Sequence, residues 1–151
     1  MLLGRLYEAD PPSGYLLHME KLLCFIIEGT EIHLDKVLID FNGIPIFFIC
    51  TDDSNHFFVV LCTDVDSLEY VVVHQSQDTI LKMLTGKISM QTVFLHSPFF
   101  WYVRSGETIQ EDIVNRCLTE QLDVSFLPTK EAMFEAISVE DRDYITRFSA
   151  R

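Results

Sequence analysis

Apolar and polar residues form alternating blocks in the first half of the chain. Residues 44–50, 57–62 and 70–74 are three apolar runs, rich in β-branched and aromatic side chains. Two short acidic segments, 52–55 and 64–67, separate these runs. Runs of this length, broken by Asp, Asn and Ser at hairpin spacing, are typical of consecutive antiparallel strands. The pattern therefore predicts a β-meander in this part of the chain.

The first two of these runs are apolar at nearly every position, so both faces of the predicted hairpin are apolar. Antiparallel sheets commonly have one face in contact with water. Either helices cover one face and early strands fold over the other, or one face is an interface with a second copy or another protein. For a turn of two or four residues, we expect one face to carry Ile46, Phe48, Cys50, Phe57, Val59 and Leu61, and the other Phe47, Ile49, Phe58, Val60 and Cys62.

The residues before the meander suggest an N-terminal arm and several early strands. Residues 1–14 form the predicted arm, which ends in the turn sequence Asp-Pro-Pro-Ser-Gly. Residues 15–17 and 21–28 are apolar enough to be strands, and a Gly-Thr pair follows them. A third short strand is expected at 37–41, ended by the Asn42-Gly43 dipeptide, which favours a tight turn.

After residue 74 the spacing of apolar residues changes. Ser76 and Ser89 can each cap a short helix, and Gly86 lies just past the end of the first one. Pro98 then opens an aromatic strand at 98–104. Ile80, Leu81 and Leu84 are expected on one stripe of the first helix, and the second, of one or two turns, runs through Val93, Phe94 and Leu95.

Residues 108–118 are ambiguous. Thr108 and Glu111 have the spacing of a capping box, and Ile109, Ile113, Val114 and Cys117 share a helical face, so we favour a helix over a strand. Further on, Thr129 can cap a helix that carries Met133, Phe134 and Ile137. Ser138 with Asp141 can cap a last helix that carries Tyr144, Ile145 and Phe148.

Together these elements predict a single α+β domain spanning residues 1–151. Its centre is an antiparallel β-meander sheet of about five to seven strands, with short helices after the meander and at the C-terminus. The strand-rich half is 15–74, and the mixed helical half is 75–151. The apolar runs are shorter than the roughly 20 residues that cross a bilayer, and no signal-like segment follows Arg5. We therefore expect a soluble, cytoplasmic protein without a membrane segment.

The charge of the chain bears on which kinds of partner it can bind. The formal net charge is −12, and residues 37–81 contain only acidic charged side chains. Residues 37–81 and residues 107–143 contribute −7 each, and the rest of the chain is slightly positive. Direct nucleic-acid binding is disfavoured because phosphate contacts need clustered cations. An acidic surface serves solubility, and it also fits a partner protein that is basic.

Residue spacing offers no recognisable catalytic, cofactor or metal site. The aspartates of the two meander turns are expected at opposite ends of the strands, so they cannot share an ion and are better explained as turn formers. Hairpin geometry places Cys50 and Cys62 too far apart for a disulfide. Cys24 with His18 or His33 is the one pairing that could form a nucleophile and base, although a thiol inside an apolar run is usually inert.

Candidate partner-binding residues come from the aromatic strand and from the second acidic segment. A core strand is the favoured interpretation of the aromatic run, and a protein-binding patch is the alternative. The candidates are Phe99, Trp101, Tyr102, Asp112, Glu120 and Asp123.

A resemblance can be added to this pattern. Its residues are 45–48, 57–61, 70–73, Leu81 and Leu84 with the sequence Gly-Lys-Ile-Ser-Met at 86–90, Phe94, and Leu127-Pro128. In these features the chain resembles a family of short bacterial and phage proteins of undefined function, which have a β-meander followed by a short helix pair. The resemblance implies a bacterial or phage origin, transfers no catalytic residue, and would make 108–118 a strand.

Three function classes follow, in order of preference. The first is a non-enzymatic, acidic protein-interaction module, which binds or regulates another protein or forms a homodimer through an apolar sheet face. The second is a DNA-mimicking inhibitor of a nucleic-acid-binding protein, with carboxylates in rows on one face. The third is an enzyme of unfamiliar type, whose pocket would hold at least two of His18, Cys24, Glu28, His33 and Asp35.

Overall fold

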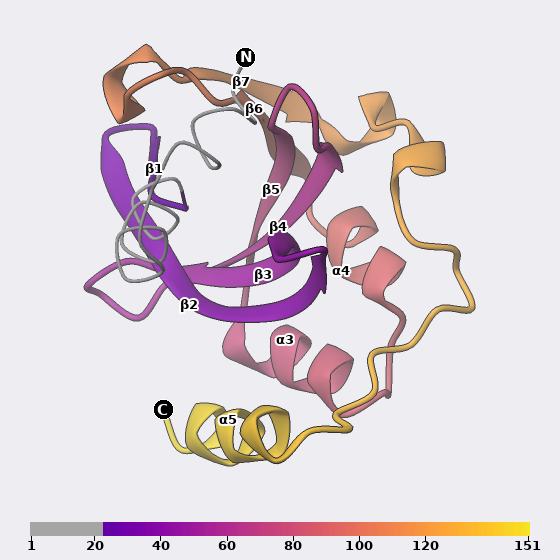
Figure 1. The fold of residues 1–151 in the computed structure, drawn as a ribbon. Coiled ribbons are helices and arrows are strands. Elements are labelled where there is room, and N and C mark those ends of the chain that lie inside the picture. The colour runs from indigo at the N-terminus through magenta and orange to yellow at the C-terminus, as the bar shows by residue number, and fades with distance from the viewer. Residues whose placement is uncertain (1–22) are drawn as a thin grey trace.

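One antiparallel sheet organises residues 23–151, the part of the chain that the computed structural model describes. Seven strands pair in sequence order, and three α-helices follow the meander (Figure 1). The predicted α+β meander is confirmed, and its sheet curls toward a barrel. The strands are β1 (Phe25–Ile27), β2 (Thr30–Phe41), β3 (Ile44–Thr51), β4 (Phe57–Asp64), β5 (Glu69–Gln75), β6 (Phe99–Arg104) and β7 (Ile113–Leu118), and the helices are α3 (Gln77–Leu84), α4 (Met90–Leu95) and α5 (Val139–Ser149).

Some predictions concern residues that are not described. The N-terminal arm at 1–14, the strand at 15–17 and His18 lie outside the described residues. The strand predicted at 21–28 is described from residue 23 onward, where β1 occupies Phe25–Ile27.

Tight turns join the first three strands. Glu28 (φ 49°) and Gly29 (φ 86°) connect β1 to β2, and Asn42 (φ 51°) and Gly43 (φ 82°) connect β2 to β3. Both central residues of a type I′ hairpin turn need positive φ, which Asn and Gly adopt most easily. The Asp40 carboxylate also accepts a hydrogen bond from the Gly43 amide at 3.1 Å. The predicted Asn42-Gly43 turn is confirmed, although β2 is longer than the strand predicted at 37–41.

The register of β3 with β4 differs from the one predicted. Five residues, 52–56, connect the two strands. The Asp52 carboxylate accepts hydrogen bonds from the amides of Ser54 (2.8 Å) and His56 (3.0 Å), which stabilise a loop of odd length. One extra loop residue exchanges the two faces because side chains alternate along a strand. Phe48 and Cys50 therefore share a face with Phe58, Val60 and Cys62, and Phe47 and Ile49 share the other with Phe57, Val59 and Leu61.

Capping signals predicted three helix starts correctly. The hydroxyl groups of Ser76, Ser89 and Ser138 each accept a hydrogen bond from the amide three residues later, at 3.0–3.1 Å. Each of these bonds satisfies one amide of the first turn, which has no partner inside the helix. The buried side chains include the predicted Ile80, Leu84, Val93, Phe94, Tyr144 and Phe148.

The helix predicted at 108–118 was wrong, because Ile113–Leu118 form the strand β7. A single 3-10 turn occupies Ile109–Glu111, and β7 then pairs with the whole of β6, from Phe99 opposite Leu118 to Arg104 opposite Ile113. This pairing supplies backbone partners that β6 would otherwise lack along its outer edge. Long-range pairing therefore outweighs the local helical spacing.

The helix predicted after Thr129 is also absent. After one turn, residues 132–138 run as an irregular segment, which we call the strap (Figure 1). The Met90 amide donates a hydrogen bond to the Ala132 carbonyl at 3.1 Å, which ties the strap to the start of α4. Phe134 is buried in the core, whereas Met133 and Ile137 remain exposed. The strap therefore follows the requirements of core packing, and its apolar residues do not share a helical face.

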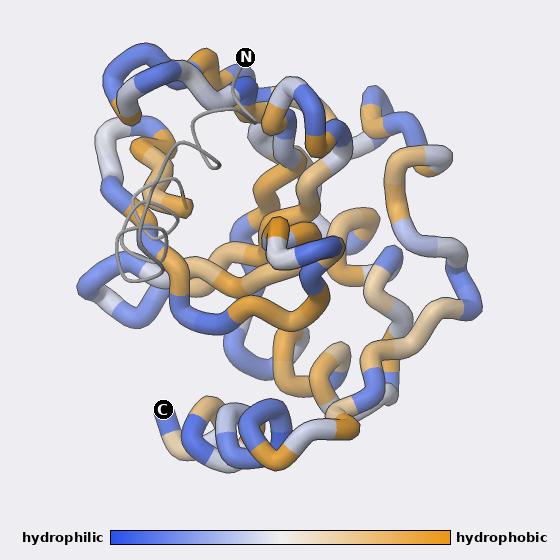
Figure 2. Tube along the Cα trace, viewed as in Figure 1, coloured by the Kyte–Doolittle hydropathy of each residue, from blue (hydrophilic) through white to orange (hydrophobic). Residues whose placement is uncertain are grey.

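Both faces of the sheet are apolar, as predicted, and both are covered within the chain. The three helices and the strap pack on one side, which we call the helical face. On the other side, the inner face, the sheet curls so that β1 and β2 approach β6 (Figure 2). The helical face includes Phe47, Ile49, Phe57, Val59, Leu61, Val71, Val73 and Phe100, and the inner face includes Phe48, Cys50, Phe58, Val60, Cys62, Tyr70, Val72, Trp101 and Val103.

Candidate protein-interaction surface

The aromatic strand β6 belongs largely to the core. Trp101 is 7% exposed and packs on the inner face. Tyr102 packs partly against the helical face, and Phe99 lies half-buried at the end of the strand. These positions support the core-strand interpretation. The surface that remains for a partner is the exposed part of Phe99 and Tyr102.

Glu28 links the two ends of the curled sheet. Its carboxylate accepts a hydrogen bond from the Trp101 indole at 2.7 Å and lies 3.6 Å from the Arg116 guanidinium. The Arg116 guanidinium in turn lies over the Phe99 ring, 3.7 Å from its centroid. Because Glu28 is in the β1–β2 turn and its partners are in β6 and β7, this cluster connects the sheet ends through side chains.

The three acidic candidates do not form one patch with the aromatic residues. Asp112 precedes β7 and accepts a hydrogen bond from the Gly106 amide at 2.7 Å. Glu120 and Asp123 follow the other end of β7, and Asp123 accepts hydrogen bonds from Ser125 as the cap of a 3-10 turn. The six residues of β7 span about 20 Å. These carboxylates therefore lie at separate ends of the strand.

Large apolar side chains remain exposed in two other regions. The first consists of β7 and the turns after it, where Ile113, Leu118, Val124 and Phe126 are each more than half exposed. The second surrounds the strap, where Ile137 is 75% exposed. Its remaining exposed members are Ile39, Met133 and Val139.

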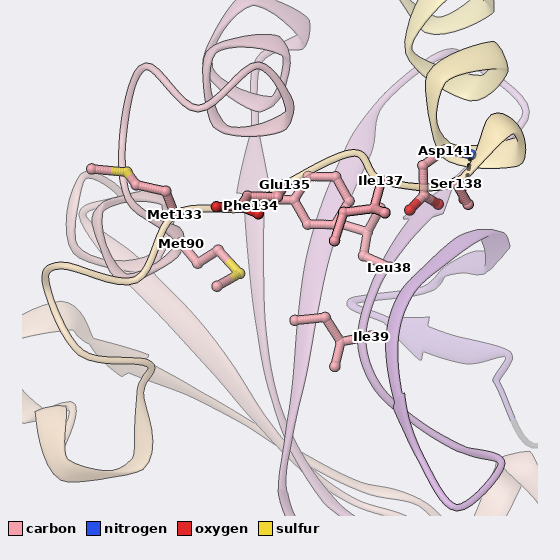
Figure 3. A pocket seen from close by; sticks show the side chains of 9 residues that line it. All are labelled: Leu38, Ile39, Met90, Met133, Phe134, Glu135, Ile137, Ser138 and Asp141. Carbon is pink, nitrogen blue, oxygen red and sulfur yellow. Dashed lines mark hydrogen bonds between the residues drawn. The ribbon is translucent and has the colours of Figure 1, made fainter.

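The second region contains an open groove between β2 and the strap (Figure 3). Its volume is about 350 Å³. Figure 3 shows Leu38 and Ile39 on the β2 side, with Met133, Phe134 and Ile137 along the strap above them. The lining residues are Leu38, Ile39, Met90, Met133, Phe134, Glu135, Ile137, Ser138 and Asp141.

Irregular pairing in β2 shapes this groove. Asp35 and Leu38 have no direct partner in β3, so each is an extra residue on β2. Bulges of this kind bend a strand and turn side chains in new directions. Leu38 and the neighbouring Ile39 thus both line the groove. At the other bulge, Asp35 accepts hydrogen bonds from the Tyr144 hydroxyl of α5 (2.6 Å) and from the guanidinium of Arg151, two residues after that helix (2.8 Å).

Two carboxylates, Glu135 and Asp141, belong to the lining of the groove. Asp141 is paired with Lys36 at 3.0 Å. Glu135 is part of the lining and has no ion pair among residues 23–151. Glu131, in the turn before the strap, and Glu140 and Asp143, on α5, are also without an ion pair within the described chain. The Arg142 guanidinium, in contrast, donates a hydrogen bond to the Ile137 carbonyl of the strap at 2.7 Å. Glu135 is therefore the lining carboxylate that has no ion pair in residues 23–151.

A second pocket of about 350 Å³ lies where the β3–β4 loop, the end of β5 and the start of α3 meet. It contains His56, His74, Gln77 and Arg151. Most of these groups already have partners: His56 lies 2.8 Å from Asp52, and the Gln77 amide donates to the Phe148 and Arg151 carbonyls. Burial and then the nearby His56 lower the pKa of His74. The polar groups of this pocket are therefore mostly engaged in contacts within the chain.

The cysteines show the features of packed thiols. Burial, followed by the Glu31 carboxylate, raises the pKa of Cys24, and burial raises the pKa of Cys62 to about 11. A thiol with a raised pKa is a weak nucleophile because the thiolate is scarce. Neither pocket above includes Cys24, Glu28, His33 or Asp35. All four cysteines are free, and no group of three potential metal ligands occurs in residues 23–151.

Comparison of the chain with known protein families, with curated proteins and with solved structures finds no match. Among the helices of residues 23–151, none has the length and apolar character needed to cross a membrane.

The groove was missed from the sequence. The sequence pattern predicted Met133 and Ile137 on one face of a helix, and it predicted Ile39 in a short regular strand. An irregular strap and a bulged strand have no simple periodic signature, so only the folded chain brings these side chains together.

Proposed function

We propose that this chain is a non-enzymatic interaction module that binds or regulates another, basic protein. The observation that carries the proposal is the exposed apolar groove beside the strap, on a chain with a formal charge of −12. Apolar surface gathered at one place often marks an interaction site. The excess negative charge of the chain favours encounter with a positively charged partner.

A homodimer through a sheet face has less support. Both sheet faces are buried by other parts of the same chain. In addition, two copies that each carry −12 repel one another. These two facts favour a different, basic protein as the partner.

The DNA-mimic alternative requires carboxylates in a continuous row. The turns at 52–55 and 64–67 lie at opposite ends of β4, an eight-residue strand that spans about 26 Å. Loop amides also occupy oxygens of Asp52 and Asp64. This arrangement counts against one row at phosphate spacing.

The enzyme alternative requires a nucleophile and a base in one pocket. Cys24 lies near Glu31, its pKa is raised, and it lies outside both pockets described above. The groove is lined mainly by carbon and sulfur atoms. Its chemistry suits contact with apolar side chains better than acid–base catalysis.

Affinity capture from an extract of the source cells tests the proposal. The immobilised chain is compared with an unrelated protein of similar size and negative charge. We expect the chain to retain a basic protein at 0.1 M NaCl and to release it at high salt, because salt screens charge attraction. The proposal is rejected if the chain retains nothing that the acidic control does not also retain.

A triple variant identifies the surface that is used. Ile39→Ser, Met133→Ser and Ile137→Ser together should abolish retention, whereas Ile113→Ser, Leu118→Ser and Val124→Ser should not. Loss of retention in the second variant alone would keep the interaction and move it to the β7 region.

A further inference from the structure

The groove between β2 and the strap has the features of a binding site for a peptide segment. We propose that it binds an extended apolar segment of the partner protein, flanked by lysine or arginine. This inference rests on the proposed function and adds the place of contact and the chemistry of the segment.

The lining determines what can bind. The Ser138 hydroxyl accepts the α5 capping bond, and Asp141 is paired with Lys36. Apart from the Glu135 carboxylate, the side chains of the lining therefore offer a polar small molecule few free groups. Ligand pockets usually measure roughly 300–1,000 Å³, so a groove of about 350 Å³ suits one or two aliphatic side chains. Met90 and Met133 can adjust their shape around such side chains.

The strap backbone favours an extended occupant. In the described chain, the amides of Met133, Phe134 and Glu135 make no backbone hydrogen bond. An irregular segment with unpaired amides can pair with a second extended chain, as in β-strand addition. A segment lying in the groove would be beside these amides, and its apolar side chains would face Ile39 and Ile137.

Charge determines the flanks of the segment. Glu135 is in the lining and has no cation partner in residues 23–151, whereas Asp141 is paired with Lys36 and the Arg142 guanidinium donates to the Ile137 carbonyl. Lysine or arginine next to the apolar residues would meet Glu135 and the excess negative charge of the chain. A second copy of this chain would instead bring more negative charge to the groove. The charges therefore select a basic segment over self-association.

Three labelled peptides test this inference in solution. Each has nine residues: one carries five Val, Ile and Leu residues between pairs of lysines, the second carries the same core between pairs of glutamates, and the third has a serine core between lysines. We expect the first alone to bind in fluorescence anisotropy, and high salt to weaken it. In a sample with ¹³C-labelled methionine methyl groups, Met90 and Met133 should shift on binding, whereas the buried Met83 should not.

Matched variants locate the binding. Ile137→Ser with Ile39→Ser should weaken the lysine-flanked peptide about tenfold, a loss typical of one or two anchor residues. Glu135→Lys should weaken it as well. The control pair Ile113→Ser and Val124→Ser replaces equally exposed residues elsewhere and should leave affinity unchanged. Thermal melts check that all variants remain folded.

Several results would overturn the inference. Equal binding of the glutamate-flanked peptide would exclude a basic segment, and loss of binding in the control pair alone would move the site to β7. A dimer in sedimentation that disappears in Ile137→Ser would make a second copy the occupant. If no peptide binds while cell extract still yields a basic partner, the groove inference fails and the proposed function stands.

Discussion

The two faces of the sheet are equally apolar, but the chain covers them by different means. On the inner face, Phe25, Phe48 and Tyr70 pack ring against ring, with centroids 5.2–6.4 Å apart, and all three belong to strands of the same sheet. On the helical face, Phe57 of the sheet meets Phe148 of α5, with centroids 4.8 Å apart. The inner face can therefore open only if the sheet separates, whereas α5 can leave while the strands stay paired.

Polar contacts at the edge of the helical face strengthen this contrast. Asp35 accepts hydrogen bonds from Tyr144 and Arg151, Lys36 pairs with Asp141, and the Gln77 amide donates to the Phe148 carbonyl of α5. Burial alone would raise the pKa of Asp35, but hydrogen bonds from Arg151 and Tyr144 outweigh it and lower the pKa. We therefore expect the attachment of α5 to weaken in acid, whereas the ring contacts of the inner face carry no charge.

Removing a ring from the inner face should have the largest effect on stability. Phe48 is fully buried, so we expect Phe48→Ala to lower the free energy of unfolding by about 3–5 kcal/mol. Urea denaturation followed by Trp101 fluorescence and by far-UV circular dichroism should give one shared, shifted transition. Phe41→Ala removes an exposed ring and should change stability by about 0.5 kcal/mol or less. A similar loss in both variants would contradict the contrast.

Removing a ring from α5 should instead produce local opening. Phe148→Ala should cost about 3 kcal/mol, most of it at the contact between α5 and the sheet. Hydrogen exchange should speed up in Val139–Ser149, while the amides of β3 to β5 stay protected. Phe126→Ala, at a ring that is 54% exposed, is the control. Equal acceleration in the helix and the central strands would show that the two faces open together.

The Asp35 cluster should have an intermediate effect. Asp35→Asn removes the charge that faces Arg151, and we expect a loss of about 1–3 kcal/mol, measured by urea denaturation at pH 7. Asp78→Asn breaks an exposed pair with Lys82 and should change stability by less than about 1 kcal/mol. If the two variants lose the same amount, the Asp35 cluster does not hold α5.

The same cluster predicts a pH dependence. Because the pKa of Asp35 is lowered in the folded chain, its contribution should be fully present above the unfolded pKa of about 3.9. It should be lost as the pH falls through the lower folded value. Stability of the unchanged chain and of Asp35→Asn, measured from pH 7 to pH 2, should therefore converge at the acidic end. Parallel curves would contradict this assignment.

The Glu28 cluster should give the smallest effect. The Glu28 side chain is 50% exposed, so water can replace much of the hydrogen bonding and ion pairing of its carboxylate. We expect Glu28→Ala to cost about 1 kcal/mol or less, and the emission of Trp101 to change because its indole loses the carboxylate. Glu31→Ala, in the adjoining strand, should leave this emission unchanged. An unaltered spectrum in Glu28→Ala would mean that the link between the sheet ends is not formed in solution.

Local signals accounted for the parts of the fold that depend on neighbouring residues. Asn42-Gly43 adopts positive φ values that few other pairs tolerate, and Ser76, Ser89 and Ser138 each bind an amide three residues away. Such interactions form within one turn of chain, so they are readable from the sequence. The placement of the meander and of α3, α4 and α5 follows from them.

Features that depend on distant partners were misread. Residues 108–118 have helical spacing, but Ile113–Leu118 pair with β6 as a strand. Met133 and Ile137 have the spacing of a helical stripe, but their segment is irregular and packs Phe134 against the core. The faces of the β3–β4 hairpin were exchanged because Asp52 stabilises a five-residue loop. In each case a contact between separated segments, or one residue of loop length, outweighed the local pattern.

By itself, the sequence determined the antiparallel meander, the caps of its helices, the two apolar faces and the excess of negative charge. Hydrophobic alternation and turn residues act over a few positions, which makes them visible in a single chain. Only the tertiary structure decided how each face is covered, where Asp35 and Glu28 find their partners, and which apolar residues remain exposed beside the strap. Those outcomes depend on bulges and on contacts between residues as far apart as Asp35 and Arg151, whose positions the fold alone brings together.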